Sequence, residues 1–364
     1  MTQDIYERLA FHLSTLGAGI PYREELVDIL RENLTPVEAE VSLALPTKVA
    51  PLQPVGVDDI IGRIALPREE LVDILERLAE RGLLYSGRTK EGEKGYALIQ
   101  QGFGFPQVFH WKGERTPYAE KMAEMLGKYY RRKVREEVAE RVKTKEYRYI
   151  PVNEAIELTT QGVYDFEMMG NVIEQARIIT VVHCPCRMKE QIEGRGCSHL
   201  MEVCIKFDEL AEYLIDRGFG REITKGEALE LIKKSEEDGL VHFVDNAQGN
   251  IQHNCNCCGC CCWNLGPIRK RKIPRDVIMA TYFITEIDED GCNGCGKCVD
   301  ICPVDVITID GDLAIIDKDW CIGCGLCSTR CKLKATRLIR RSDVVPSPSF
   351  RELHETLLVE RGLK

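Results

Sequence analysis

The residues with the clearest chemistry are cysteines, and near the C-terminal end of the chain their spacing is regular. The run Cys292-x2-Cys295-x2-Cys298-x3-Cys302 recurs 29 residues later as Cys321-x2-Cys324-x2-Cys327-x3-Cys331. This internal repeat predicts two equivalent half-units. A loop with three cysteines at this spacing can wrap three corners of an inorganic cube, because thiolates are the soft ligands of iron–sulfur clusters. Zinc is the weaker interpretation, since structural zinc sites use paired rather than tripled cysteines.

Residues 282–341 resemble the two-cluster bacterial-type ferredoxin domain, on the strength of both motifs and of Pro303 after the first one. The resemblance implies two [4Fe–4S] clusters and an exchange of the fourth ligand between the half-units. It assigns one cluster to Cys292, Cys295, Cys298 and Cys331, and the other to Cys321, Cys324, Cys327 and Cys302.

Ten further cysteines lie upstream, and none of the 18 precedes Cys184. They are Cys184, Cys186, Cys197, Cys204, Cys255, Cys257, Cys258, Cys260, Cys261 and Cys262. Residues two apart on a strand face the same way, so we predict that Cys184 pairs with Cys186, and Cys255 with Cys257, on one cluster. Adjacent cysteines in the run 257–262 must point apart. We expect one or two further iron–sulfur clusters here, with zinc or buried redox-active thiols as alternatives.

This central arrangement resembles poorly characterised cysteine-rich iron–sulfur proteins of anaerobes over about residues 150–340. Its marks are Cys-x-Cys-Arg and Cys-Asn-Cys-Cys-Gly-Cys-Cys-Cys ahead of the ferredoxin-type unit. The resemblance implies cluster binding and redox work, and it supplies no substrate. We expect the adjoining His183, His199 and His253 to be structural or to support ligands rather than to be ligands themselves. Arg187 either offsets thiolate charge or is an ordinary surface arginine.

The elements that must position these residues predict a multi-domain α+β chain. The apolar positions Leu71, Ile74, Leu75 and Leu78 predict a helix over 68–82. A hairpin is expected to follow it over 83–99, so residues 1–100 resemble a winged-helix domain, which we interpret as a docking module. The remaining predicted parts are a helical connector (101–150), a cysteine-rich α+β central domain (151–275), the dicluster ferredoxin fold (282–341) and a tail helix (342–364).

Composition narrows the range of partners. The chain of 364 residues has 49 basic and 58 acidic residues and a net charge of −9, which disfavours nucleic acid and anionic membrane surfaces. The N-terminus lacks a secretory signal pattern, and no apolar run reaches membrane-spanning length, so we expect a soluble cytoplasmic protein without direct membrane insertion. In that compartment clustered cysteines bind metals rather than form disulfides. The sequence also lacks a dinucleotide or phosphate-loop motif.

We therefore predict an electron-transfer component that relays single electrons between redox partner proteins in an anaerobic oxidoreductase system, rather than a stand-alone enzyme. No catalytic residue and no oligomeric state follow from the sequence. One alternative is an oxidoreductase whose central cluster reacts with substrate. The other is a redox-sensing winged-helix regulator, which the five acidic residues of the helix over 68–82 disfavour.

Overall fold

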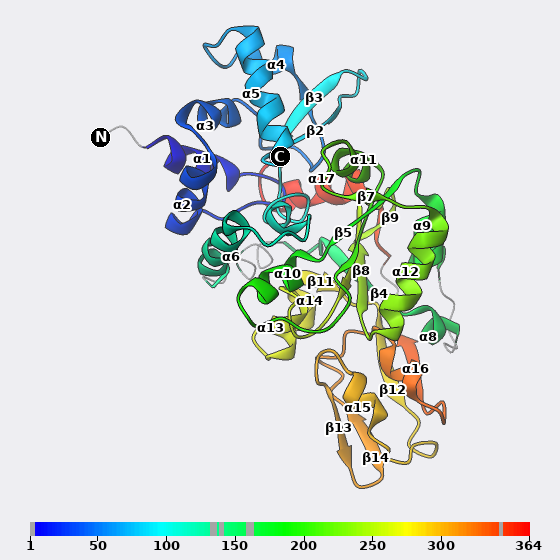
Figure 1. The fold of residues 1–364 in the computed structure, drawn as a ribbon. Helices are drawn as coiled ribbons and strands as arrows, with labels where there is room; N and C mark the ends of the chain where they lie inside the picture. The colour runs from blue at the N-terminus through cyan, green and yellow to red at the C-terminus, as the bar shows by residue number, and fades with distance from the viewer. Residues whose placement is uncertain (1–3, 132–136, 138–141, 158–163, 342–344) are drawn as a thin grey trace.

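The computed structural model describes residues 4–131, 137, 142–157, 164–341 and 345–364. Helices and strands are mixed along the chain, as predicted: a helical N-terminal region, a central sheet and a C-terminal unit that projects from one end (Figure 1). How these parts divide into domains stays a prediction.

The N-terminal region places five helices around a small antiparallel sheet of order β1-β3-β2. Its helices are α1 (Ile5–Leu13), α2 (Glu24–Asn33), α3 (Pro36–Leu43), α4 (Val57–Ile61) and α5 (Arg68–Glu80). Its strands are β1 (Val55–Gly56), β2 (Leu84–Arg88) and β3 (Lys94–Leu98). The predicted helix over 68–82 is confirmed as α5, and its four apolar positions are buried. The classification of this region as a winged helix stays a prediction.

The range predicted as a connector contains more than helix. It holds the 3-10 helix η1 (Gln107–His110), the helix α6 (Pro117–Tyr130) and the strand β4 (Tyr147–Ile150). Thr116 begins α6 by accepting a hydrogen bond from the amide of Ala119 at 3.1 Å. Residues 132–136 and 138–141 of the predicted helical stretch lie outside the described residues. β4 belongs to the central sheet, because it pairs with β8.

Within the described residues the central sheet has the strand order β11-β4-β8-β10-β6-β5-β7. Neighbouring strands are antiparallel except β11 and β4. The remaining strands are β5 (Ile179–His183), β6 (Glu202–Phe207), β7 (Arg221–Glu222), β8 (Val241–Asp245), β10 (His253–Cys257) and β11 (Met279–Ala280). The accompanying helices are α8 (Asn153–Glu157), η2 (Asp165–Glu167), α9 (Met169–Gln175), α10 (Pro185–Ile192), α11 (Asp208–Asp216), α12 (Lys225–Glu237), α13 (Leu265–Arg269) and α14 (Arg275–Ile278).

The two faces of this sheet differ in chemistry. On one face, Ile205 and Val244 pack with the helices α9 and α12 in an aliphatic core. The alternate residues, among them Cys204, Phe243 and Cys257, belong to the core on the other face. Strand alternation thus directs central cysteines to a single side of the sheet.

The C-terminal unit contains two strand pairs and two short helices. They are β12 (Phe283–Ile287), α15 (Lys297–Ile301), β13 (Ile307–Asp310), β14 (Leu313–Ile316), α16 (Leu326–Arg330) and β15 (Thr336–Arg340). The chain then returns to the body, where β16 (Ser347–Ser349) pairs with β9 (Ala247–Gly249). The tail ends in α17 (Phe350–Glu360), which confirms a helix after Pro348.

Candidate metal centres

The C-terminal unit has two similar halves, and each half places three cysteines in a loop that ends in a short helix. Gly296 begins α15 and Gly325 begins α16, with φ angles of 79° and 78°. Only glycine adopts this left-handed backbone without steric strain, so the sequence builds the same turn twice. β12 pairs with β15 and β13 with β14, which interlocks the halves.

The sulfurs of this unit are placed as thiolate ligands of a cluster would be. Backbone amides point at them, from Ala314 to Cys292 Sγ at 3.4 Å and from Ala335 to Cys331 Sγ at 3.2 Å. A metal-bound thiolate accepts such hydrogen bonds. No hydrogen bond joins two sulfurs among the eight cysteines of this unit, all of which are described. A cube requires this separation, because its iron atoms lie between the thiolates.

The two halves differ in exposure. Cys295 of the first loop is exposed, whereas Cys321, Cys324 and Cys327 of the second loop are buried. The second loop rests on the body of the protein, where the amide of Val152 donates to the carbonyl of Cys324 at 3.0 Å. Burial raises the pKa of the Cys324 thiol, and the thiol of Cys302, which lies within electrostatic range, raises it further. The assignment of ligands to two clusters stays a prediction.

Six of the central cysteines form a closed circle of neighbouring thiols, which we call the six-sulfur ring. Each thiol interacts with the next in the order Cys184, Cys186, Cys262, Cys257, Cys255 and Cys204, and Cys204 returns to Cys184. The sulfurs of Cys204 and Cys255 are 3.8 Å apart. The ring draws on β6, on β10 and its following turn, and on the start of α10.

One local prediction about this ring is confirmed and one is wrong. Cys255 and Cys257 lie on β10 and interact, as strand alternation predicts. Cys184 and Cys186 also interact, but not as strand residues, because β5 ends at His183. A helix, α10, begins at Pro185, since proline is well suited to the first turn of a helix. The first helical turn, rather than a pleat, brings these two thiols together.

The other four central cysteines form a second cluster, the four-sulfur group, which comprises Cys197, Cys258, Cys260 and Cys261. Cys197 Sγ lies 3.9 Å from Cys258 Sγ and 3.4 Å from Cys261 Sγ. The prediction that adjacent cysteines point apart holds for Cys257 and Cys258, and for Cys261 and Cys262, which are divided between the two groups. It is wrong for Cys260 and Cys261, which both belong to the four-sulfur group.

Arg187 lies beside both groups of thiols. It is 0% exposed, and its Nη2 donates to the carbonyl of Asn256 at 3.0 Å. Burial opposes its charge, but the thiols of Cys184 and Cys257 outweigh burial and raise the pKa of Arg187. The interpretation of Arg187 as a surface residue is wrong; it is placed to compensate thiolate charge.

A second buried cation, Lys206, lines a cavity that all six ring thiols also line. Burial alone would lower the pKa of this 2% exposed lysine, but Cys204 and Cys255 outweigh burial and raise it. The cavity measures about 90 Å³. One water needs roughly 10–15 Å³ of such space, so the cavity is larger than a water site. Its six thiols are the donor type of an iron–sulfur cluster, but neighbouring ring sulfurs stand closer than the ligands of a bound cube, so a cube would require the ring to widen.

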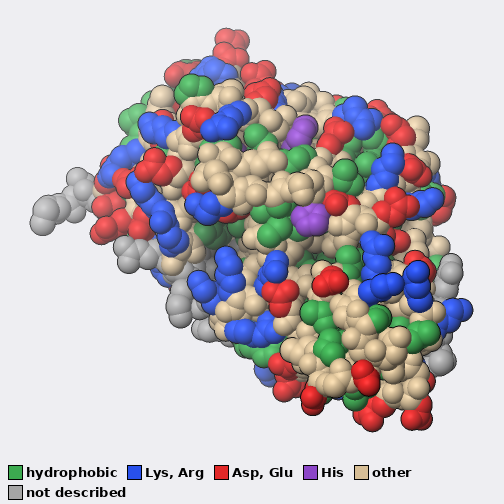
Figure 2. All heavy atoms as spheres, turned by 60° about the horizontal axis from the view of Figure 1, so that its bottom comes forward, with side chains coloured by type: hydrophobic (Ala, Val, Ile, Leu, Met, Phe, Trp, Pro, Cys, Tyr) green, Lys and Arg blue, Asp and Glu red, His purple; other side chains and the backbone are tan. Residues whose placement is uncertain are grey.

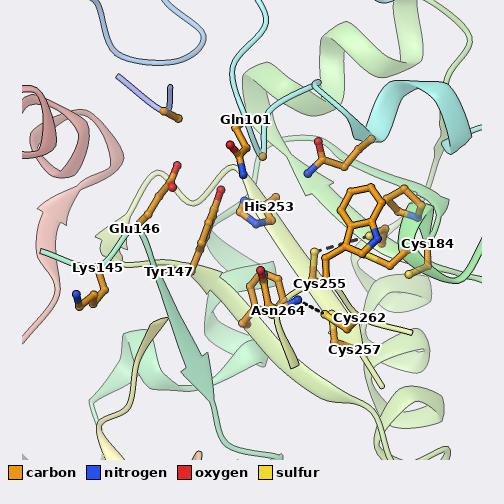
Figure 3. Close-up of a pocket in the computed structure, with 18 of the residues that line it drawn as sticks. Gln101, Lys145, Glu146, Tyr147, Cys184, His253, Cys255, Cys257, Cys262 and Asn264 are labelled. Carbon is orange, nitrogen blue, oxygen red and sulfur yellow. Dashed lines mark hydrogen bonds between the residues drawn. The ribbon is translucent and has the colours of Figure 1, made fainter. Parts of the chain in front are cut away.

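The wall facing the sulfurs is polar, with Gln101, Glu146 and His253 opposite Cys257 and Cys262 (Figure 3). The Oε1 atom of Glu146 is buried without a hydrogen-bond partner, and burial raises the pKa of this carboxyl to about 7. Of these residues, the sequence pointed to His253, as a neighbour of the cysteines, but not to Gln101 or Glu146. It also missed Lys206, although a lysine within the apolar strand β6 is a signal.

His253 is held by a buried carboxylate, because its Nδ1 lies 2.9 Å from Oδ1 of Asp245. The ring of Tyr147 meets its imidazole edge-on at 4.9 Å. His199 is placed similarly by Asp238, at 3.1 Å from Nδ1. Such carboxylate contacts orient an imidazole beside a metal site. His199 also lies with Cys197, Cys258 and Cys260 in a group whose ligand atoms are all within 4.8 Å of one another, so the expectation that it is not a ligand stays a prediction.

A buried tyrosine connects the two regions of cysteines. Tyr149 of β4 is 3% exposed, and its hydroxyl has no hydrogen-bond partner. Burial raises the pKa of Tyr149 far above its ordinary value, and the thiols of Cys262, Cys257 and Cys324 raise it further. Tyr149 thus lies within electrostatic range of the six-sulfur ring and of the second loop of the C-terminal unit.

Comparison with known proteins agrees with this chemistry in one segment. Residues 285–308 match the family model described as a 4Fe-4S binding domain. The match and the cysteine clusters support iron–sulfur cluster binding. No curated protein and no solved structure matches the chain. Among the helices of the described residues, none combines the length and the apolar character needed to cross a bilayer.

Proposed function

We propose that the protein is an iron–sulfur electron-transfer protein in which the C-terminal unit exchanges electrons with a cluster held in the six-sulfur ring. One observation carries the proposal. Tyr149 is buried within electrostatic range of Cys257 and Cys262 of the ring and of Cys324 of the C-terminal unit, so both sets of thiols lie around the same part of β4. Each [4Fe–4S] cluster, when bound, accepts or gives one electron.

The proposal assigns two clusters to the C-terminal unit with exchanged fourth ligands. One would be held by Cys292, Cys295, Cys298 and Cys331, the other by Cys321, Cys324, Cys327 and Cys302. The family match at 285–308 supports cluster binding by the first half. The separated sulfurs and the amides pointed at them support it for both halves.

The exposed first half is the expected contact for a redox partner protein. Cys295 is exposed there, and several acidic side chains of the same unit are exposed as well. Figure 2 turns this end of the molecule forward and shows acidic side chains along its lower rim. The exposed acids of the unit include Asp288, Glu289, Asp290, Asp310, Asp312 and Asp319. We therefore expect a partner with a basic docking face, because opposite charge speeds association and orients it.

The buried second half is the expected inner station. Its loop lies on the body near Val152, and the turn that carries the four-sulfur group touches the unit at Pro303. Arg271 strengthens this contact by donating to the carbonyls of Val304 at 2.8 Å and Asp305 at 2.7 Å. A fixed contact keeps the distance between electron carriers constant.

The number of thiols in the cavity favours a relay over a substrate-reducing enzyme. Six thiols line it and a cube takes four, so every iron has a protein ligand available and no coordination position is left open for a substrate. Lys206 and Arg187 balance thiolate charge, a role that a relay also requires.

The test is anaerobic purification followed by counts of iron and acid-labile sulfide, then EPR during stepwise reduction. Two clusters in the C-terminal unit give about eight irons, and a third cluster in the ring raises the count to about twelve. Colourless protein without sulfide would overturn the proposal.

Tyr149→Phe tests the connection between the sites. It removes one buried hydroxyl, and we expect unchanged iron and sulfide but a shifted reduction potential for a cluster beside it. Tyr164→Phe, at an exposed tyrosine, is the matched control. Identical redox titrations of Tyr149→Phe and the wild type would contradict the placement of clusters near Tyr149.

A further inference from the structure

The four-sulfur group is more compact than the six-sulfur ring, because in the ring each thiol interacts with its two neighbours, whereas here nearly every thiol interacts with every other. Five of the six possible pairs among Cys197, Cys258, Cys260 and Cys261 interact directly. The two measured separations are 3.9 Å, from Cys197 to Cys258, and 3.4 Å, from Cys197 to Cys261. These five contacts form two triangles that share the Cys197–Cys258 edge, and folding them about that edge gives the tetrahedron of a single metal ion.

The size of this tetrahedron indicates how many metal ions it holds. Four sulfurs at about 2.3 Å from one ion, in tetrahedral geometry, stand about 3.8 Å from one another. The measured separations bracket that value. A cube would hold its thiolates farther apart because four iron atoms lie between them, and the C-terminal unit has no hydrogen-bonded pair of sulfurs. The four-sulfur group is therefore sized for one ion.

The chain shapes this site from two segments. Cys197 lies in the connection between α10 and β6, and the other three lie in the turn after β10. The turn closes on itself, because the amide of Cys262 donates to the carbonyl of Cys258 at 3.3 Å. Val203 and Leu240 pack with Cys258 and Cys261 in a small apolar cluster, which shields one side of the site from water.

Charge around the group suits a tetrathiolate complex. Four thiolates around a divalent ion carry a net charge of −2, and Arg187, buried beside Cys258, offsets part of it. His199 borders the site, with a ring nitrogen within 4.8 Å of the sulfurs of Cys197, Cys258 and Cys260. The carboxylate of Asp238 holds its Nδ1 at 3.1 Å, which orients the imidazole. Four cysteines already complete a tetrahedron, so His199 acts as a neighbour.

We propose that Cys197, Cys258, Cys260 and Cys261 bind a single thiolate-preferring divalent ion, zinc or iron, in a mononuclear site separate from the iron–sulfur clusters. The ion ties the turn after β10 to the connection before β6. The turn is bordered by Cys257 and Cys262, which are both members of the six-sulfur ring. The site therefore fixes the spacing of two ring thiols. With zinc the site is purely structural, and with iron it can also change charge by one electron.

The test begins with the wild-type chain, prepared anaerobically and analysed for zinc, iron and sulfide. We expect either one zinc per chain or one iron in excess of sulfide. X-ray absorption of that ion should show four sulfurs at about 2.3 Å and no metal neighbour. Absence of zinc together with equal amounts of iron and sulfide would overturn the proposal. So would a metal neighbour in the spectrum of the extra ion.

Paired variants then separate this site from the ring. Cys260→Ser alters the exposed member of the group, and we expect it to lose the single ion and keep its sulfide. A triple variant with Cys184→Ser, Cys204→Ser and Cys255→Ser leaves three of the six ring thiols, too few for a cube, and we expect the opposite pattern. A loss of about four sulfides in Cys260→Ser would overturn the mononuclear site. Unchanged sulfide in the triple variant would instead contradict the ring cluster of the proposed function and leave this site standing.

His199→Ala tests the ligand set. We expect this variant to retain the ion, because the four sulfurs provide the whole coordination sphere. Loss of the ion in His199→Ala would overturn the tetrathiolate assignment. Should Cys260→Ser fail to fold, the absorption spectrum of the wild-type chain decides the question by itself.

Discussion

Replacement of Glu146 with glutamine is expected to remove a pH-dependent penalty from the folded protein. Burial raises the pKa of Glu146 from 4.5 to about 7. The folded protein therefore keeps a proton on this carboxyl between pH 4.5 and pH 7, where the unfolded chain has released it. In this interval the folded protein binds more protons than the unfolded chain, so its free energy of unfolding falls as pH rises. Above pH 7 the full loss of stability remains. At 1.36 kcal/mol for each pKa unit, the difference between 7 and 4.5 corresponds to about 3 kcal/mol.

Glutamine is neutral at every pH and similar in size, so Glu146→Gln isolates the charge. Proteins with tightly bound clusters unfold irreversibly, and the assay is therefore an apparent Tm at one fixed scan rate under anaerobic conditions. At pH 8 we expect the variant to melt about 6 °C above the wild type, from roughly 2 °C per kcal/mol. At pH 5 the two curves should coincide.

The control for this measurement is Glu114→Gln, which alters an exposed glutamate. It should melt with the wild type at both pH values. Iron content is measured in each sample, so that a change in cluster occupancy is not taken for a change in the protein. Parallel pH dependences of Glu146→Gln and the wild type would refute the reasoning, because a buried carboxyl that ionises without penalty is not desolvated.

Three further predictions concern other parts of the molecule. Burial lowers the pKa of His110 from 6.5 to about 4, so the wild type should lose about 3 kcal/mol as pH falls through that interval. His110→Leu should lack this acid sensitivity in circular-dichroism melts. A Tm that falls with pH as steeply in the variant as in the wild type would contradict the prediction. A Cβ at Gly259 would lie 1.8 Å from the carbonyl oxygen of Pro303, so Gly259→Ala should separate the cysteine turn from the C-terminal unit and lower the Tm, whereas Gly226→Ala, in open helix, should not. Lys206→Met should lower the reduction potential of the ring cluster by about 120 mV, since a charge at roughly 6 Å and an effective dielectric of about 20 contributes about 3 kcal/mol. An EPR redox titration with an unshifted potential would show that Lys206 does not face the cluster.

Much of the local structure followed from spacing in the sequence. The helix α5 was predictable because Leu71, Ile74 and Leu78 recur at the period of a helix, and this period is a property of the backbone. The loops of the C-terminal unit were predictable for the same reason, since three cysteines within seven residues can reach one centre only by wrapping around it. The separation of Cys257 from Cys258 also followed, because adjacent side chains on a strand face opposite ways.

Other features depended on residues that are distant along the chain. The ring joins Cys184, Cys204 and Cys255, which nothing in their spacing connects. Local geometry even misled in one place, where Pro185 begins a helix in a segment predicted to be strand. The sequence by itself determined that the protein binds clusters with thiolates, because ligand type and short spacing are local properties. Only the tertiary structure decided how the ten central thiols divide between the six-sulfur ring and the four-sulfur group, and that Lys206 and Tyr149 lie near them. The order of strands in the sheet fixes those distances, and that order arises from packing of the whole chain.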